Sequence, residues 1–116
     1  MTATATAATF AELTTMRVGG PIGRLFTPTS SADVVELLRG HGGAGGQLLV
    51  LGGGSNLVVG DVGWSGTVVK ITTTGVRIEG ERVTAAAGME WDDLVRLTVE
   101  QGLAGLECLS GIPGSV

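Results

Sequence analysis

Three consecutive glycines, Gly52, Gly53 and Gly54, follow directly after the apolar run at residues 47–51. A short apolar run bounded by glycine is typical of a buried strand, so the chain is expected to turn sharply where this strand ends. Without side chains, the amides of these glycines can face one concave site, and such a nest binds anions, above all phosphate. Ser55 and Asn56 add side-chain donors beside it. The same glycines also fit a tight turn without a ligand.

The loop differs from the two commonest phosphate-binding loops. A Walker loop places Lys and then Ser or Thr after its last glycine, whereas Gly54 is followed by Ser55 and Asn56. A dinucleotide-binding fingerprint requires a small residue at position 57, which is occupied by Leu57. If this loop binds phosphate, it therefore does so as a loop of another kind.

The order of the expected elements indicates a mixed α and β domain of the α+β class. One helix is expected after Ser30 or Ser31, whose hydroxyl can cap the first turn, and it should end at Gly40 and the glycines at 42 and 43. A second helix is expected over residues 90–101, with Gly102 as its stop. The expected strands cover residues 22–27, 47–51, 67–71, 76–79 and 82–86, and the last two should form a hairpin.

Composition narrows the classes of function. The net charge of −4 and the aromatic share of 3% disfavour nucleic-acid binding, and the charge also disfavours an anionic membrane surface. Cys108 is the only cysteine, so a disulfide within the chain and a multi-cysteine metal site are excluded. Residues 1–12 are expected to be a flexible tail, and their Ala and Thr alternation lacks the features of a signal peptide. We therefore expect a cytoplasmic protein without a metal.

Three glycine-rich blocks, taken together and in order, are similar to one known family. The first block is residues 14–21 (TTMRVGGP), the second is residues 51–57 (LGGGSNL), and the third is residues 102–116 (GLAGLECLSGIPGSV). Their order and spacing resemble the UDP-N-acetylenolpyruvoylglucosamine reductase (MurB) family of cell-wall synthesis. One block alone would be a weak signal, whereas the three together extend the resemblance over about residues 13–116.

The resemblance implies an FAD-binding domain of the vanillyl-alcohol-oxidase (PCMH) type, in which two α+β subdomains hold the flavin between them. Residues 13–116 are expected to form the first subdomain and the start of the second, so that the domain is cut at its C-terminal end. The glycine loop is expected to lie against the FAD pyrophosphate. The cofactor-binding residues that the resemblance implies are Gly52, Gly53, Gly54, Ser55, Asn56, Ile112, Pro113, Gly114 and Ser115.

The resemblance also implies the activity of the whole enzyme. NADPH passes a hydride to FAD, and reduced FAD passes it to UDP-N-acetylglucosamine enolpyruvate, which gives UDP-N-acetylmuramate for peptidoglycan. The expected partners are these small molecules, without nucleic acid or membrane. The family's catalytic serine, arginine and glutamate match no position here, so no catalytic residue is assigned. With half of the cleft missing, the isolated chain is expected to be inactive and to bind FAD weakly or not at all.

Two other functions stay open. The glycine nest alone is compatible with a non-catalytic nucleotide- or phosphate-binding module that is complete at Val116. The fold is also compatible with a fragment of another flavin oxidase, which would share the glycine loop but lack the block at residues 105–114. Fold analogy alone does not separate these functions, since one fold hosts many activities.

Three further polar residues have both a functional and a structural interpretation. Arg17 could neutralise a phosphate, or it could be solvated or cap a helix. The resemblance implies that Glu107 and Ser110 flank a loop on the flavin side, whereas by themselves they are expected to serve turn and hydrogen-bond geometry.

The remaining conspicuous residues are expected to be structural. Trp91 should belong to the core, and Asp92 and Asp93 should stabilise the N-terminus of their helix by charge. His41 should be a solvated loop residue, and Cys108 a small buried hydrophobe.

Overall fold

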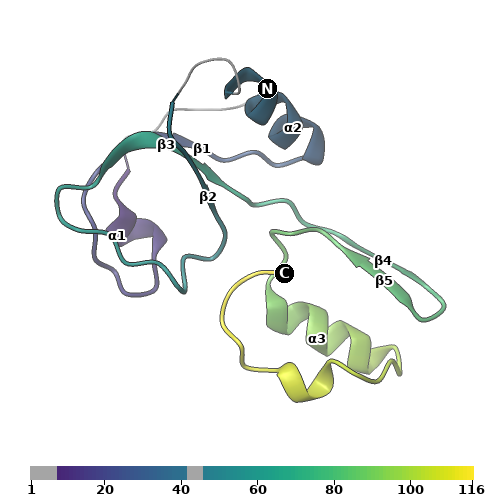
Figure 1. Cartoon of the computed structure of the whole chain (residues 1–116). Coiled ribbons are helices and arrows are strands. Elements are labelled where there is room, and N and C mark those ends of the chain that lie inside the picture. Colours follow the sequence, from purple (N-terminus) through teal and green to yellow (C-terminus); the bar gives the residue numbers. More distant parts are fainter. Residues whose placement is uncertain (1–7, 42–45) are drawn as a thin grey trace.

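The computed structural model describes residues 8–41 and 46–116, which form two units (Figure 1). The sheet unit, residues 8–71, contains β1 (Ile22–Phe26), β3 (Trp64–Lys70) and β2 (Leu48–Leu51). The strand order is β1-β3-β2, and both pairings are parallel. Residues 67–69 of the central strand β3 are buried, because the middle strand of a parallel sheet is covered on both faces. The predicted strands are confirmed, although β3 begins three residues earlier than expected.

The core of the sheet unit gathers around Phe10, which is fully buried. Phe10 begins the short helix α1 (Phe10–Leu13), and its burial stabilises the fold by roughly 2–3 kcal/mol. The buried residues that pack with it are Ile22, Leu25, Leu51 and Val68. The prediction of a flexible tail over residues 1–12 is therefore wrong for residues 8–12, whereas residues 1–7 lie outside the described part of the chain.

Helix α2 (Ser31–His41) is capped by Ser30. The Ser30 hydroxyl oxygen accepts a hydrogen bond from the Asp33 amide at 3.1 Å and donates to the Asp33 carboxylate at 2.7 Å. The helix ends at His41, within the glycine-rich segment predicted to end it, although Gly40 itself is still helical, because a single glycine costs a helix only about 1 kcal/mol. His41 is consequently the last helical residue and is half-buried, not a solvated loop residue. The two glycines predicted to follow the helix, Gly42 and Gly43, lie outside the described residues.

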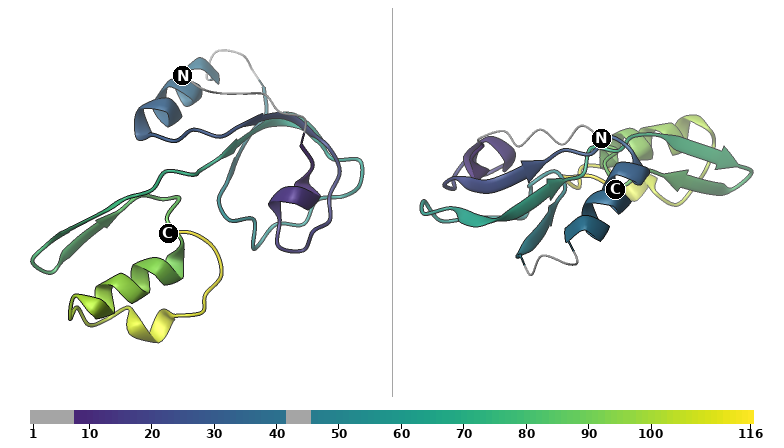
Figure 2. Two further views of the ribbon diagram at one scale, coloured as in Figure 1. Left: turned by 180° about the vertical axis from the view of Figure 1, so that it is seen from behind. Right: turned by 90° about the horizontal axis from the view of Figure 1, so that it is seen from above.

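The hairpin unit covers residues 76–116. Strands β4 (Val76–Glu79) and β5 (Arg82–Ala85) pair antiparallel around Gly80 and Glu81, as predicted. Helix α3 (Trp91–Glu100) follows and lies alongside the hairpin (Figure 2), and η1 (Glu107–Leu109) is a single 3-10 turn. Leu94, Val95 and Thr98 form the buried face of α3.

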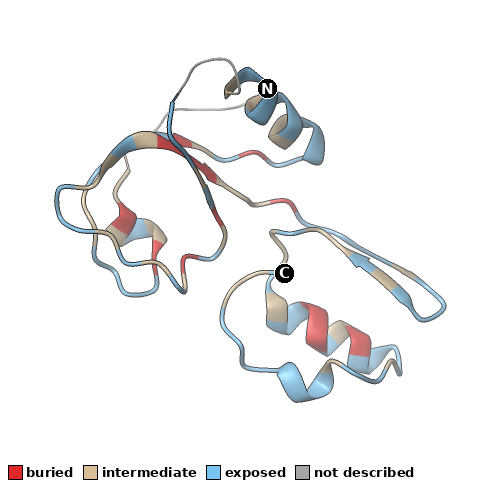
Figure 3. Cartoon of the chain, in the orientation of Figure 1, coloured by how far each residue is buried: buried red, intermediate tan, exposed pale blue. Residues whose placement is uncertain are grey.

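Most buried residues fall into two separate groups (Figure 3), one in the sheet unit and one on α3, and Thr73 is buried in the segment that connects the two units. The Cα radius of gyration is 16.0 Å, whereas a compact domain of this length would have about 13 Å. The two units are therefore set apart and do not share a single core. They meet where residues 52–56 of the sheet unit approach residues 113–115 of the hairpin unit.

Candidate functional site

The glycine loop, residues 52–56, leaves the sheet at the end of β2. In the parallel pairing of β2 with β3, Leu51 lies opposite Lys70, so both strands end at the same edge. Loops diverge beyond the carboxyl ends of parallel strands and leave a crevice, which is where open sheets of this kind bind ligands. The sequence-predicted loop therefore lies at the edge of the sheet best suited to hold a ligand.

Gly54 fixes the shape of the glycine loop. It is buried and has a φ of +70°, a conformation that L side chains rarely adopt. A Cβ at this position would collide with the carbonyl oxygen of Leu13. The Gly54 carbonyl accepts a hydrogen bond from the Thr15 amide at 3.0 Å. Backbone packing of the loop against the segment after α1 therefore requires glycine here.

The amides of the glycine loop are available as donors. Among residues 8–41 and 46–116, none accepts a hydrogen bond from the amide of any residue from 52 to 56. Backbone N–H groups in folded proteins almost always have a partner, so a row of free amides is expected to face water or a ligand. Consecutive free amides of this kind form an anion-binding concavity.

A second loop, residues 110–115, forms the opposite wall. The Ser55 hydroxyl donates a long hydrogen bond to the Pro113 carbonyl at 3.4 Å. A Cβ on Gly53 would lie 3.2 Å from the Cα of Gly114, and a Cβ on Gly52 would lie 2.9 Å from the Ser115 hydroxyl oxygen. The close approach of these two walls, about 60 residues apart in sequence, therefore depends mainly on Gly53, because the backbone of Gly114 cannot turn aside as the Ser115 hydroxyl can.

Helix α3 holds the 110–115 loop in place. The Asp92 carboxylate accepts hydrogen bonds from the Ser110 hydroxyl at 3.2 Å and the Gly111 amide at 2.8 Å. The Trp91 indole N–H donates to the Leu109 carbonyl at 2.8 Å. Trp91 is half-buried and anchors the loop, so its prediction as a simple core residue is wrong.

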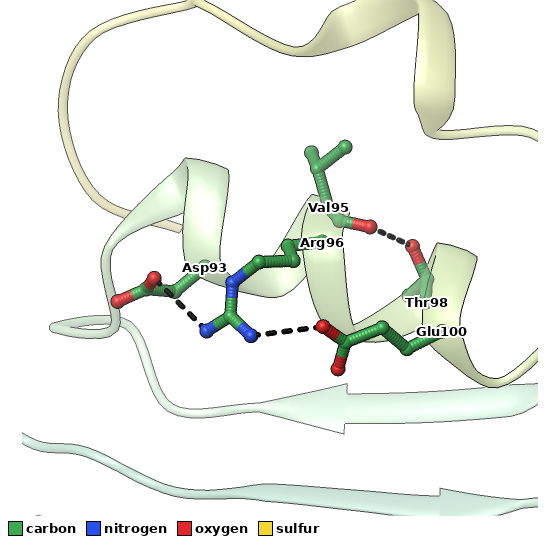
Figure 4. Close-up of polar contacts among 5 residues, drawn as sticks. All are labelled: Asp93, Val95, Arg96, Thr98 and Glu100. Carbon is green, nitrogen blue, oxygen red and sulfur yellow. Dashed lines mark hydrogen bonds and ion pairs between the residues drawn. The ribbon is translucent and has the colours of Figure 1, made fainter.

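The two acidic residues at the start of α3 have different partners. Asp92 binds the 110–115 loop, which the prediction of a general helix-terminus charge did not include. Asp93 instead pairs with Arg96 at 3.3 Å, and Arg96 also reaches Glu100 at 3.1 Å (Figure 4). The carboxylates separate because adjacent side chains of a helix point in different directions.

A cavity of about 330 Å³ lies between the two walls. Its lining includes eight of the nine predicted cofactor-binding residues, namely Gly52, Gly53, Gly54, Ser55, Asn56, Pro113, Gly114 and Ser115. Ile112, the ninth, is 52% exposed and lies outside the lining. The fold thus brings both predicted blocks to one site.

A second cavity, of about 490 Å³, adjoins the first at Gly52, Gly53 and Ser115. Sequence reasoning missed its other lining residues, which include Lys70, Thr72, Thr74, Gly88 and Met89. One sequence signal could have identified Lys70. It is the chain's only lysine, and it directly follows the buried residues of strand β3.

Lys70 contacts the glycine loop directly. Its ammonium donates a hydrogen bond to the Gly52 carbonyl at 3.2 Å, and its side chain is half-buried. Arg17, with a φ of +54°, lines a third cavity of about 470 Å³ together with Lys70 and Gly53. Arg17 therefore lies near the glycine loop, as its phosphate interpretation requires.

The other singled-out residues lie outside these cavities. The Glu107 carboxylate accepts a hydrogen bond from the Gly105 amide at 2.6 Å, as expected for a residue that shapes a turn. Its own amide and that of Gly105 hold the pKa of Glu107 below the usual range. Cys108 is exposed, so its prediction as a buried hydrophobe is wrong, because η1 presents it to solvent.

In the described ranges, no three His, Cys, Asp or Glu side chains come together as a metal site would require. No helix in the same part of the chain has the length and apolar character needed to span a bilayer.

The chain matches a known sequence family and known proteins over most of its length. Residues 22–116 match a sequence-family model described as FAD binding domain. The chain is 54% identical over 108 residues to UDP-N-acetylenolpyruvoylglucosamine reductase of Streptomyces avermitilis, covering 93% of this chain and 30% of that protein. It is 47% identical over 116 residues to the reductase of Mycobacterium leprae, covering 96% of this chain and 32% of that protein. The chain thus spans about a third of the length of these curated relatives.

A solved structure shows the same architecture. The crystal structure of UDP-N-acetylenolpyruvylglucosamine reductase (MurB) from Thermus caldophilus matches with a TM-score of 0.78 and 29% identity. The match covers 99% of this chain and 40% of that chain. The α+β fold class and the resemblance found in the sequence are both confirmed.

Proposed function

Because the chain belongs to the family of FAD binding domains, we propose that it forms the part of a UDP-N-acetylenolpyruvoylglucosamine reductase that binds the pyrophosphate of FAD. The observation that carries this proposal is that residues 52–56, whose amides have no acceptor among the described residues, line one cavity together with residues 113–115. A pyrophosphate offers several acceptor oxygens and negative charge, which is what such a row of donors binds. The residues present therefore fit the group.

The two walls have different roles in the proposed site. Residues 52–56 supply backbone donors, and Ser55 and Asn56 add polar side chains to the same cavity. Gly114 and Ser115 close the site from the other side, and the absence of a side chain on Gly53 lets the two walls approach closely. Charge-assisted hydrogen bonds from several amides are each stronger than neutral ones, so this arrangement favours a phosphorylated flavin.

The proposed activity of the whole protein follows its relatives. FAD supplies the hydride transfer when it is bound, with NADPH as hydride donor and UDP-N-acetylglucosamine enolpyruvate as acceptor, in the cytoplasmic stage of peptidoglycan synthesis. The residues of this chain bind and orient the cofactor, and none of them is assigned a catalytic role.

The test compares two glycine substitutions in the complete gene product. Gly53→Ala places a methyl group 3.2 Å from the Cα of Gly114 and should weaken FAD binding about tenfold, because it pushes the two walls of the cavity apart. Gly60→Ala is the control, since a Cβ there meets nothing within 4 Å. FAD dissociation constants would be measured by flavin fluorescence, and NADPH oxidation with the UDP-sugar enolpyruvate would be followed in parallel.

Three outcomes would contradict the proposal in whole or in part. If the wild-type protein binds no FAD, the proposed FAD site is excluded. Equal FAD affinity of the Gly53→Ala and Gly60→Ala proteins would show that FAD does not bind at the glycine loop. Tight FAD binding without oxidation of NADPH by the UDP-sugar would keep the site and exclude the reductase activity.

A further inference from the structure

Lys70 lies at the end of β3, next to the glycine loop. The parallel register places Lys70 opposite Leu51, one residue before the loop begins. From this position its ammonium reaches the carbonyl oxygen of Gly52 at 3.2 Å. An ammonium has three donors, so two of them are left for other partners.

The hydrogen bond from Lys70 constrains the next amide. The Gly52 carbonyl and the Gly53 N–H belong to one peptide group, and this peptide is trans. In a trans peptide these two groups point in opposite directions. With the carbonyl turned toward Lys70, the Gly53 N–H is turned away from it. Lys70 lines the cavities of about 490 and 470 Å³, but it is not in the lining of the 330 Å³ cavity between the two walls.

The hydrogen bond from Lys70 is needed because this part of the loop consists of glycine. Residues 52–54 lack side chains, so the peptide groups between them can rotate more freely than in any other sequence. The Gly54 side of the loop is held by its bond from Thr15, whereas Lys70 supplies the one side-chain bond to the Gly52 carbonyl within the described residues.

The charged residues that line the neighbouring cavity also indicate a role for Lys70. The cavity of about 490 Å³ is also lined by Glu90 and Asp93. Lys70 is the only cation among the described residues that line it. Without this ammonium, the charged residues that line this cavity would be Glu90 and Asp93, and both disfavour an approaching anion.

We propose that Lys70 is a positioning residue, which holds the Gly52–Gly53 peptide so that its N–H faces the cavity between the two walls, and which makes the site prefer a flavin with a pyrophosphate over one without. This role rests on the proposed FAD site. Lys70 acts through the peptide, because a cation on a carbonyl oxygen polarises the N–H of the same group and strengthens its bond to an anion.

The experiment measures ligand preference in the complete gene product. Dissociation constants for FAD and for riboflavin, which has no phosphate, are determined for wild type, Lys70→Met, Lys70→Arg and Arg24→Met. Lys70→Met should weaken FAD binding about tenfold and leave riboflavin binding unchanged, and Lys70→Arg should restore most of the preference because it keeps a cationic donor. Arg24→Met removes the same charge from an exposed residue of β1 and should change neither constant.

A second measurement needs no ligand. In protein labelled with [15N]glycine, the amide signal of Gly53 should move in Lys70→Met and stay in place in Arg24→Met, because only Lys70 contacts this peptide. A loss of general stability would instead weaken FAD and riboflavin binding alike and shift many glycine signals.

The outcomes separate the two proposals. Wild-type protein that prefers FAD, with an equal preference in Lys70→Met, overturns the role of Lys70 alone. A Gly53 amide signal that stays in place in Lys70→Met also overturns the role of Lys70 alone. Wild-type protein that binds FAD no better than riboflavin overturns the proposed function and the role of Lys70 with it.

Discussion

The two walls of the proposed cleft are held in place by different kinds of interaction. The glycine loop is fixed by steric contact, since Gly54 is buried against the segment after α1 and has no room for a side chain. The 110–115 loop is largely exposed and is fixed by polar bonds from Asp92 and Trp91. A wall built on close backbone packing fails when atoms are added to it, whereas a wall held by hydrogen bonds fails when an acceptor is removed.

The difference follows from what lies beneath each wall. The sheet unit offers a buried parallel strand, β3, on which a loop can pack closely. The hairpin unit buries only one face of α3, and the loop beside that helix rests on side chains at its N-terminal turn. Three predictions test this comparison.

The largest effect is expected for Gly54→Ala. Alanine at a φ of +70° costs about 1 kcal/mol, and the collision with the Leu13 carbonyl adds about 1–3 kcal/mol of overpacking. Gly102→Ala is the matched control, because Gly102 has a φ of +71° with open space around a Cβ and isolates the strain alone. Denaturant unfolding of the complete gene product measures both. Equal destabilisation by the two substitutions would show that packing does not hold the first wall.

An intermediate effect is expected for Asp92→Ala. The Ser110 hydroxyl and the Gly111 amide both lose their acceptor, which should destabilise the 110–115 loop by about 1 kcal/mol in this exposed position. Hydrogen exchange at the Gly111 amide should quicken by several fold. Asp93→Ala removes the same charge one residue later, where only Arg96 is lost as a partner, and should leave Gly111 unchanged. Similar exchange in both variants would refute the role of Asp92.

The smallest effect is expected for the pH response of Glu107. Its folded-state pKa is held below the ordinary value of 4.5, chiefly by its own amide and that of Gly105. A depressed carboxyl pKa adds stability that is complete above the unfolded-state pKa and is lost as the pH falls through the folded-state pKa. The Gly105 amide signal should therefore titrate below pH 4.5 in wild type and not in Glu107→Gln. A Gly105 signal that titrates in both proteins would exclude this bond as the cause.

Most local structure could be predicted from the sequence. The hairpin at Gly80 and Glu81 and the Ser30 cap depend on neighbouring residues, so local patterns indicated them correctly. The predictions were wrong where contacts between residues far apart in the sequence determine the structure. Phe10 belongs to the core because β1 and β3 enclose it, and the alternation of Ala and Thr before it gives no sign of that contact.

The candidate site divides in the same way. Both predicted blocks have the glycines that a close approach requires, and eight of the nine predicted residues line one cavity. Lys70 and Asp92 were not predicted as site residues, because each acts through a bond to a residue 18 or 19 positions away. A spacing of that length carries no local signal.

The sequence by itself determined the elements, the glycine loop and the family, because hydrophobic period, turn residues and motif order are properties of short segments. Only the tertiary structure decided which groups hold the loops. The register of β2 against β3 sets Lys70 behind Gly52, and the direction of side chains at the start of α3 turns Asp92 to Gly111 and Asp93 to Arg96. Such contacts depend on how separate segments pack, and packing is set by the whole core and not by any one segment.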